Sequence, residues 1–437
     1  MQPKIALIGG GLAGCEAAWQ LHRAGAAVTV YEMKPQRYSP AHSNPNLAEL
    51  VCSNSFRSDD LNSAPGLLKA EMRRLGSLIM AEADKARVPA GKALAVDREE
   101  FAASITDHLH QARDVHLVRR EIGSLSDPAL TPYSRVIVAA GPLASPDLTA
   151  SLLHRTKEQG LFFYDAIAPI VSADSINWER VFWGSRYDPE SRDYLNCPLN
   201  EDEYHALRQG LLSGERVLGK DFEQQVHFEG CLPVETMAER GEMTLAFGPL
   251  KPVGLTDPRT GERPFAVVQL RAENREKTMF NLVGFQTKLT YSDQKRVLRL
   301  IPGLEQADFL RLGSIHRNTF VHAPRVLTSD LQLKEAPGIF LAGQITGVEG
   351  YIESAACGLW LGLHLGRKVS LPPRETALGG LLNHLREPQD TFQPMNVNFG
   401  LLPALNRRMK KAKRKEAYVN RAQAALEEWL SGLGEDG

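Results

Sequence analysis

A glycine-rich turn near the start of the chain limits its fold more than any other feature. An apolar run, Ile5 to Ile8, ends in the pattern Gly9-x-Gly11-x-x-Gly14, and an alanine-rich helical pattern follows to Gly25. A second β-rich run then ends in Glu32, 18 residues beyond Gly14. This order of strand, turn, helix and strand predicts a Rossmann-like unit that binds a dinucleotide.

Each part of this motif has a physical task. Gly9 allows the tight turn, Gly11 lets a pyrophosphate approach the backbone, and Gly14 lets the helix pack closely on the strand. The helix N-terminus offers N–H groups and a positive dipole end to phosphate. An acidic residue at the end of the second strand suits a ribose hydroxyl pair and would repel a 2′-phosphate. We therefore predict a cofactor site that comprises Gly9, Gly10, Gly11, Leu12, Ala13, Gly14 and Glu32.

Two later segments return to the same kind of structure. The β-rich run 135–140 ends in the small-residue turn Ala139-Ala-Gly-Pro142, and the buried run 338–343 leads through Gly347-Val-Glu-Gly350 into a helical pattern, 351–367. A helix N-terminus placed there would stabilise an anionic reduced flavin ring, although an ordinary strand-to-helix turn is the alternative. We predict Gly141, Gly343 and Gln344 as further cofactor contacts.

The sequence between these segments differs in composition and in hydrophobic pattern. Aromatic residues, prolines and short alternating runs, including 265–272 and 278–287, predict an inserted α+β body on an antiparallel sheet. Before it, helical patterns cover about 67–87 and 99–111. We therefore predict an α/β fold in four segments: a dinucleotide-binding domain over 1–145, the insert over 146–315, a return segment over 316–370 and a C-terminal segment over 371–437.

Composition excludes several classes of function. The 437 residues carry a formal net charge of −1, so any nucleic-acid binding must be local. The five cysteines are widely spaced and form no CxxC pair, which argues against a zinc ribbon or a disulfide framework; no metal site is predicted. No apolar run approaches the roughly 18–20 residues that span a bilayer. The first strand begins near the start of the chain, so we expect no signal peptide, no membrane partner and a cytoplasmic location.

The strongest local charge lies near the C-terminus. Residues 407–415 hold seven basic side chains in nine, without an acid. Seven apolar residues near three- and four-residue spacing predict an amphipathic helix with one docking face: Leu405, Met409, Ala412, Val419, Leu426, Trp429 and Leu433. Two alternatives to nucleic-acid binding are a helix face that is merely solvated, as in most charge runs, and non-specific binding to an anionic surface. This run favours contact with a phosphate backbone. The predicted RNA contacts are Arg407, Lys410, Lys411, Arg414 and Lys415.

Two cysteines lie in polar, turn-like sequence. Cys52 is in Leu50-Val-Cys-Ser-Asn-Ser-Phe-Arg57, and Cys231 lies between Gly230 and a Leu-Pro pair. Nucleophilic thiols occupy polar, partly open sites, whereas a cysteine taken alone is more often a small buried hydrophobe. Cys15 and Cys357, on helical patterns, fit the buried alternative, and Cys197 is undecided.

Together these pieces resemble the folate- and FAD-dependent tRNA (uracil-5-)-methyltransferases. The matching segments run along nearly the whole chain: Gly9-Gly-Gly-Leu-Ala-Gly14, Leu50 to Arg57, Glu229-Gly-Cys-Leu-Pro-Val-Glu235, His316-Arg-Asn-Thr-Phe320, Gly343-Gln-Ile-Thr-Gly-Val-Glu-Gly-Tyr351 and Phe392-Gln-Pro-Met-Asn-Val-Asn-Phe-Gly400. The family commonly has Gly-Ala-Gly where this chain has Gly9-Gly-Gly11; position 10 is the variable one.

The resemblance implies a Rossmann-like FAD-binding domain of the glutathione-reductase type, with 5,10-methylenetetrahydrofolate as carbon donor and the T-loop uridine of tRNA as acceptor. It also implies reduced FAD as hydride source and NADH or NADPH as a transient external reductant. Cys231 is the candidate for addition to uracil C6, and Cys52 for base activation or removal of the C5 proton, a division that stays open. The folate and substrate neighbours implied are Arg98, His316, Glu349 and Tyr351.

Two alternatives remain open at this point. The sister family that modifies the wobble uridine of tRNA shares FAD, folate and much of the motif order, but has a longer C-terminal helical domain. The other alternative is a flavoprotein that only binds RNA or regulates in a redox-dependent way. Oligomeric state is not predicted.

Overall fold

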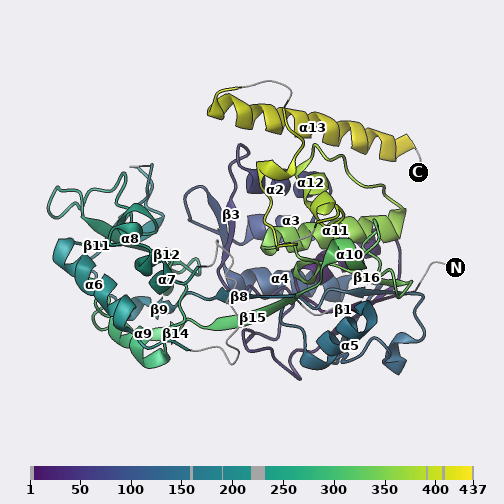
Figure 1. Cartoon of the computed structure of the whole chain (residues 1–437), viewed down its shortest axis with the longest axis horizontal. Helices are drawn as coiled ribbons and strands as arrows, with labels where there is room; N and C mark the ends of the chain where they lie inside the picture. The colour runs from purple at the N-terminus through teal and green to yellow at the C-terminus, as the bar shows by residue number, and fades with distance from the viewer. Residues whose placement is uncertain are drawn as a thin grey trace.

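The computed structural model describes residues 4–157, 161–188, 190–217, 232–389, 392–405 and 409–435. Within these residues the chain forms two bodies, each with its own hydrophobic core. The larger body contains both dinucleotide-binding segments and the C-terminal helices, and the smaller one is the insert, at the left of Figure 1.

A parallel sheet forms the centre of the larger body. Its strands are β1 (Ile5–Ile8), β2 (Val28–Glu32), β6 (Val115–Arg119), β7 (Arg135–Val138) and β16 (Ile339–Leu341), in the order β16-β7-β1-β2-β6. All the pairings are parallel, with Ile5 opposite Val28 on one side and Arg135 on the other. The predicted unit of strand, helix and strand is present, because helix α1 (Leu12–Arg23) connects β1 to β2.

Helix α1 packs along α11 (Tyr351–Arg367), and glycines make this approach possible. A Cβ on Gly358 would lie 2.1 Å from the carbonyl oxygen of Ala13, and one on Gly362 would lie 2.8 Å from that of Ala17. Gly366 meets Ala24 one turn further on. The two helices therefore run in the same direction, so both N-termini reach the same end of the sheet.

Further elements complete the larger body. A small antiparallel sheet has the order β3-β5-β4, from Ser55–Ser58, Ala93–Val96 and Arg87–Val88. The helices are α2 (Ala64–Arg74), α3 (Leu78–Lys85), α4 (Arg98–Gln111), α5 (Pro146–Thr156), α10 (Ala323–Val326) and α12 (Ala377–His384).

Two boundaries differ from the sequence expectation. The single helix expected over 67–87 is two helices, because Gly76 adopts a positive φ of 73° and Ser77 caps the next helix by accepting the Met80 N–H. Helix α5 lies after the expected boundary at 146, yet its Leu148 and Leu152 are buried in the core of the larger body. The separate core of the insert therefore starts beyond α5.

The insert is built on an antiparallel sheet, as predicted. In the described part of the chain its strand order is β10-β11-β12-β13-β9-β14, from Phe182–Gly184, Tyr194–Leu199, Ala266–Ala272, Met279–Leu282, Ile170–Ser172 and Phe309–Arg311. Its helices are α6 (Glu201–Ser213), α7 (Val234–Glu239), α8 (Thr244–Phe247) and α9 (Tyr291–Leu298). The paired strands β8 (Leu161–Ala166) and β15 (Ile315–Phe320) connect the insert to the larger body.

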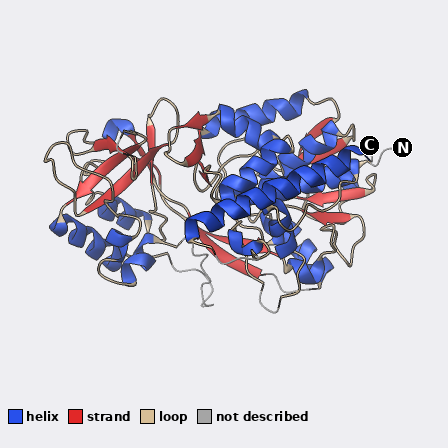
Figure 2. Cartoon of the chain, turned by 90° about the horizontal axis from the view of Figure 1, so that it is seen from above, coloured by secondary structure: helices blue, strands red, loops and turns tan. Residues whose placement is uncertain are grey.

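Helix α13 (Lys411–Glu435) lies across the larger body above α2 and α12 (Figure 1). Val419, Ala422 and Leu426 are buried, and the Trp429 indole donates to Ser370 Oγ at 3.0 Å. The amphipathic helix predicted there is thus present. Seen from above in Figure 2, helices cover the larger body, while the strands of the insert stand apart. Among the described residues, no helix has the length and apolar character needed to cross a bilayer.

Candidate functional site

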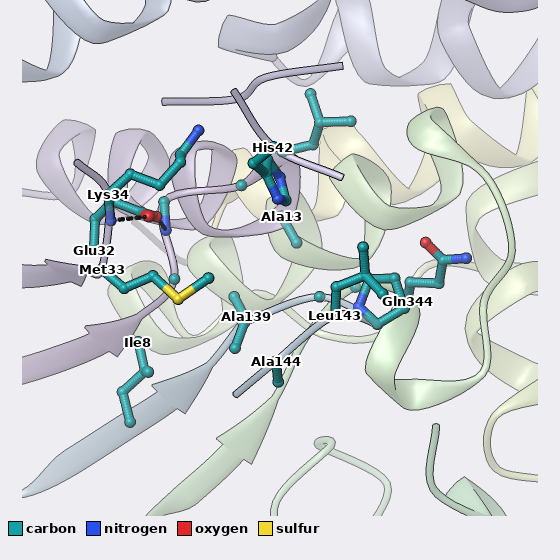
Figure 3. A pocket seen from close by; sticks show the side chains of 18 of the residues that line it. Ile8, Ala13, Glu32, Met33, Lys34, His42, Ala139, Leu143, Ala144 and Gln344 are labelled. Atoms are coloured by element: carbon teal, nitrogen blue, oxygen red, sulfur yellow. Dashed lines mark hydrogen bonds between the residues drawn. The ribbon is translucent and has the colours of Figure 1, made fainter. Parts of the chain in front are cut away.

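A pocket opens at the carboxyl ends of β1, β2, β7 and β16, where α1 begins. We call it the glycine pocket, and Figure 3 shows it from close by. It is lined by the turn Gly9–Ala13, by Glu32 to Lys34, by 139–145 and by Ala342 to Gln344. Ligands of open α/β sheets bind at this edge.

The glycines of the first turn have the geometry that their tasks require. Gly9 has a φ of 103°, and a Cβ there would lie 2.6 Å from the Ala139 carbonyl oxygen. A Cβ on Gly14 would lie 2.0 Å from the Gly9 carbonyl oxygen, so only glycine lets the helix pack this closely. Around Gly11 no atom lies within 4 Å of the Cβ position. The backbone is therefore open to a ligand at the residue predicted for pyrophosphate approach.

Glu32 is held at the end of β2 beside this turn (Figure 3). One carboxylate oxygen accepts the Gly10 N–H at 2.7 Å, and the other accepts the Lys34 N–H at 2.9 Å. The side chain lines the pocket and is 6% exposed. A fixed carboxylate with remaining lone pairs can accept hydrogen bonds from a diol such as a ribose.

The segments 139–145 and 342–344 form the other side of the pocket. Gly141, Gly343 and Gln344 all line it, and a Cβ on Gly343, which has a φ of 80°, would lie 2.7 Å from the Ala13 Cβ. Helices α1 and α11 begin at Gly11 and Gly350 without a side-chain cap. Their uncapped N–H groups suit anionic groups of a ligand. These features fit a dinucleotide with a flat ring system.

His42 is a pocket residue that sequence reasoning missed. It lines the glycine pocket, and its Nδ1 lies 2.6 Å from Ser39 Oγ. Burial, with the nearby Lys34 ammonium, lowers the pKa of His42 to about 4, so the ring is neutral at pH 7. No motif surrounds His42 in the sequence, and only the folded loop brings it to the pocket.

A second pocket, which we call the thiol pocket, contains Cys52. It is formed by the loop 51–57, by Ile167 and Ala168, by strand β13 and the turn after it, and by Glu349 to Ile352. The cavity measures about 320 Å³. Val51, Pro142, Leu143, Gln344 and Tyr351 line both pockets, so the pockets are adjacent and share these residues as a wall. A ligand ring at the end of the glycine pocket would therefore face the chamber that holds Cys52.

Tyr351 fixes the backbone of the Cys52 loop. Its hydroxyl oxygen accepts the N–H of Cys52 at 2.7 Å and that of Ser53 at 3.1 Å. Burial raises the pKa of Tyr351, which keeps the phenol protonated. The first residue of α11 thus positions the thiol-bearing loop at the junction between the two pockets.

The insert holds the same loop from the opposite side. Arg271 donates from Nε to Asn54 Oδ1 at 2.8 Å, and Asn54 donates to the carbonyl oxygens of Val96 and Ala272, each at 3.0 Å. Burial lowers the pKa of Arg271. Because Asn54 lies two residues beyond Cys52, the position of the thiol depends on the contact between the two bodies.

Arg98, predicted as a folate neighbour, lines neither pocket. It forms an ion pair with Glu273 and donates from Nη1 to the Leu50 carbonyl oxygen at 2.7 Å. Burial alone would lower the pKa of Arg98, but the Glu273 carboxylate raises it overall. Arg98 lies behind the Cys52 loop and supports it.

The other predicted substrate residues do come together. His316, Glu349 and Tyr351 all line the thiol pocket. His316 Nε2 lies 2.9 Å from Ser314 Oγ, and burial together with Arg311 lowers the pKa of His316. Gln344 Nε2 donates to Glu349 Oε2 at 2.6 Å, which links the glycine pocket to this cluster.

The C-terminal motif also reaches the thiol pocket. Asn396 lines it and donates from Nδ2 to the Glu349 carbonyl oxygen at 2.7 Å. Met395 and Val348 form a parallel bridge beside it. The sequence placed residues 392–400 among the matching motifs but assigned them no role.

Two predicted residues, Cys231 and Arg407, lie outside the described residues. The described chain resumes at 232, where the Val234 N–H donates to the Gln286 carbonyl oxygen at 2.7 Å, and Gln286 lines the thiol pocket. Glu235, fully buried, accepts the Lys288 N–H at 2.7 Å. The segment that follows Cys231 is therefore anchored at the wall of the thiol pocket.

Among the described residues, the predicted RNA contacts line neither pocket. Lys410 precedes α13, and Arg414 and Lys415 are exposed on its first turns; of Lys411 only the backbone is described. Cys15, Cys197 and Cys357 are buried, so the buried alternative is confirmed for Cys15 and Cys357. Among the described residues, no group of three or more His, Cys, Asp or Glu could hold a metal ion.

Comparisons with known proteins give consistent matches. The family model described as "Glucose inhibited division protein A" matches residues 4–371. A protein of Oleidesulfovibrio alaskensis named methylenetetrahydrofolate–tRNA-(uracil-5-)-methyltransferase TrmFO is 61% identical over 433 residues, 98% of this chain and 97% of that protein. A protein of Geobacter sulfurreducens with the same name is 56% identical over 438 residues, 99% of this chain and 100% of that protein.

Among solved structures, Aquifex aeolicus GidA in its form I crystal aligns with a TM-score of 0.68 at 16% identity, over 98% of this chain and 76% of that chain. At this identity the likeness shows the fold alone. It confirms the predicted α/β class: a Rossmann-like parallel sheet with an inserted α+β body and a C-terminal helical segment.

Proposed function

The chain belongs to the glucose inhibited division protein A family and to the family of methylenetetrahydrofolate–tRNA-(uracil-5-)-methyltransferases, and we propose that it methylates C5 of a uracil in tRNA. The observation that carries this proposal is that the two pockets are adjacent and share lining residues. A cofactor held by the glycine turn would end beside the Cys52 loop, where a pyrimidine has room.

We propose that the glycine pocket holds FAD. The Gly9–Gly14 turn and the start of α1 would receive the pyrophosphate, and Glu32 would accept the ribose hydroxyls. The start of α11 would face the ring system. When bound, this flavin supplies the redox chemistry, including the hydride that completes a methyl group from a folate-derived carbon. NADH or NADPH would supply the electrons from outside.

The thiols give the pyrimidine its reactivity. Uracil C5 is a poor nucleophile until a nucleophile adds at C6, and a thiolate is suited to that addition. We propose Cys231 for this step, since only two residues separate it from Val234, which is anchored beside the pocket. Cys52, which lines the same pocket, would help to activate the base or remove the C5 proton.

We propose that 5,10-methylenetetrahydrofolate enters the thiol pocket next to the flavin. His316, Glu349 and Tyr351 line that space and offer a ring, a carboxylate and a phenol to a flat heterocycle. Arg98 has a positioning role instead, because it reaches the site only through the Leu50 carbonyl and Glu273.

The acceptor that we propose is the T-loop uridine of tRNA. This base is folded into the tRNA elbow and must be extruded before reaction. The cationic segment around Lys410, Arg414 and Lys415 would contact phosphates while this happens. Since the substrate is tRNA, we propose a cytoplasmic location.

The test is the product itself. Unmodified tRNA, labelled methylenetetrahydrofolate and NADPH are incubated with the protein, and the labelled nucleotide is localised by mass spectrometry. We expect 5-methyluridine in the T-loop. Label at the anticodon would instead indicate the wobble-uridine reaction, and a flavin-loaded protein that binds tRNA without product would indicate an RNA-binding flavoprotein.

A further inference from the structure

The insert presents large apolar side chains to solvent beside the thiol pocket. Phe247, the last residue of α8, is 80% exposed, Tyr187 is 66% exposed and Val253 is 37% exposed. Single exposed apolar residues are common on proteins, but a group of them marks a binding surface more often. We call this surface the aromatic rim.

Contacts within the insert connect Tyr187 to the segment 249–254, which follows Phe247 in the chain. The Lys251 ammonium lies 5.5 Å from the centroid of the Tyr187 ring, and Lys251 is four residues beyond Phe247. Arg186, next to Tyr187, donates to the Pro249 carbonyl oxygen at 2.8 Å. A Cβ on Gly254 would lie 3.0 Å from the Tyr187 nitrogen, which places Val253 at the same surface.

The rim is part of an ordered structure. The residues before Phe247, Leu245 and Ala246, are buried in the core of the insert. Tyr187 has a positive φ of 67°, a conformation that costs energy for a residue with a side chain. Such strain persists where the surrounding structure imposes it and is frequent at functional sites. The exposure of these rings is therefore built into the fold.

The rim adjoins the wall of the thiol pocket. Gly284 lines that pocket, and a Cβ on it would lie 2.9 Å from the Pro249 Cβ. Pro249 lies between Phe247 and Lys251 in the chain. A base that enters the thiol pocket along this wall would bring its neighbours in the strand to the rim.

We propose that the aromatic rim stacks the unpaired nucleotides that flank the target uridine while that base occupies the thiol pocket. The proposal rests on the proposed function, because it presumes an RNA substrate. Exposed aromatic rings with a nearby cation are the usual means of binding single-stranded nucleic acid, since every base has a π-face. The Phe247 and Tyr187 rings would supply the stacking surfaces, and Lys251 a phosphate contact.

The experiment compares Tyr187→Ala/Phe247→Ala with the wild-type protein on a T-arm stem–loop RNA. We expect the KM for RNA to rise about tenfold, with kcat less affected, because stacked bases contribute to binding. FAD content and melting temperature should not change. Tyr291→Ala is the matched control: Tyr291 is also exposed, at 59%, but starts α9 at the opposite end of the insert (Figure 1). Phe247→Trp, in the otherwise wild-type protein, should keep the wild-type KM.

A fluorescent readout separates stacking from other contacts. With 2-aminopurine next to the target uridine, binding to the wild-type protein should quench fluorescence, and the double variant should not quench it. A wild-type KM and unchanged quenching in the double variant would overturn the proposal, as would self-association that depends on Phe247. If the wild-type protein quenches but makes no 5-methyluridine, the proposed function fails and the stacking surface stands.

Discussion

The glycine pocket and the thiol pocket share a wall but are built in different ways. The glycine pocket is formed around glycine-containing turns, strand ends and helix starts, most of them in continuous motifs. The thiol pocket is lined by residues from many separate stretches of the chain and is held by Tyr351, Arg271 and Asn396. Changes to the first should therefore affect folding and cofactor retention together, whereas changes to the second can affect chemistry alone.

The largest effect that we expect is on chemistry without loss of fold. Cys52→Ala should lower kcat for tRNA methylation by roughly a thousandfold or more, as for other residues that act on the reacting atoms. FAD content and melting temperature should stay at wild-type values. Cys197→Ala, which removes a buried thiol from the core of the insert, is the control and should keep full turnover. Activity within tenfold of wild type in Cys52→Ala would contradict the role of this thiol.

Loss of both stability and cofactor is expected when the packing of α1 along α11, which supports the glycine pocket, is disturbed. Gly358→Ala places a Cβ about 2.1 Å from the Ala13 carbonyl oxygen, so α1 and α11 must separate. We expect a loss of about 3 kcal/mol in unfolding free energy, measured by urea denaturation, and reduced FAD content.

The matched control for Gly358→Ala is Gly432→Ala. Gly432 lies in α13 with no atom within 4 Å of its Cβ position, so alanine should be neutral or stabilise the helix by up to about 1 kcal/mol. Equal destabilisation by both substitutions would show that close packing at Gly358 is not the cause.

A third prediction concerns acid sensitivity of the glycine pocket. The folded-state pKa of His42 is lowered from 6.5 to about 4, so the folded protein binds fewer protons than the unfolded chain. This stabilising contribution is present above pH 6.5 and is lost as the pH falls towards 4. Between pH 7 and pH 5, the wild type should lose about 2 kcal/mol more unfolding free energy than His42→Asn. Parallel stability curves for the two proteins would refute the assignment.

The smallest effect is on cofactor affinity. Glu32→Gln keeps the shape of the side chain but leaves one of the two N–H donors, of Gly10 or Lys34, without its carboxylate acceptor. We expect FAD to bind about tenfold more weakly by equilibrium titration, with normal kcat at saturating FAD. Glu121→Gln is the comparison, because Glu121 also lines the pocket but pairs with the exposed Arg37. Equal losses in both variants would indicate a general charge effect.

The sequence predicted the glycine pocket better than the thiol pocket, for a physical reason. A turn that needs glycine for close approach carries its geometry in adjacent residues, so Gly9, Gly11 and Gly14 could be assigned tasks from spacing alone. Arg271 and Asn396 reach the thiol pocket only because strands distant in the chain pair with each other, and nothing near them signals this. Arg98 shows what residue type alone leaves out: it suited a ligand, but in the fold Glu273 and the Leu50 carbonyl occupy its guanidinium.

The helices also differ in how well the sequence pattern predicted them. The amphipathic pattern predicted the burial of Val419 and Leu426 on α13, but Met409, which it also assigned to the docking face, precedes the helix and is 40% exposed. The break between α2 and α3 was missed because an apolar periodic pattern continues through it, and the signal lies in the single pair Gly76-Ser77. Cys231 and Arg407 stay predictions, as both lie outside the described residues.

The connection through β8 and β15 has a consequence for how such proteins diversify. The chain leaves the larger body along β8 and comes back along β15, with Leu161 opposite Phe320 and Ala166 opposite Ile315. Departure and return are thus neighbours, and the intervening 150 or so residues form a cassette. Evolution can lengthen, trim or exchange such a cassette without rerouting the rest of the chain, and so can redirect one ancestral flavin chemistry to a new acceptor.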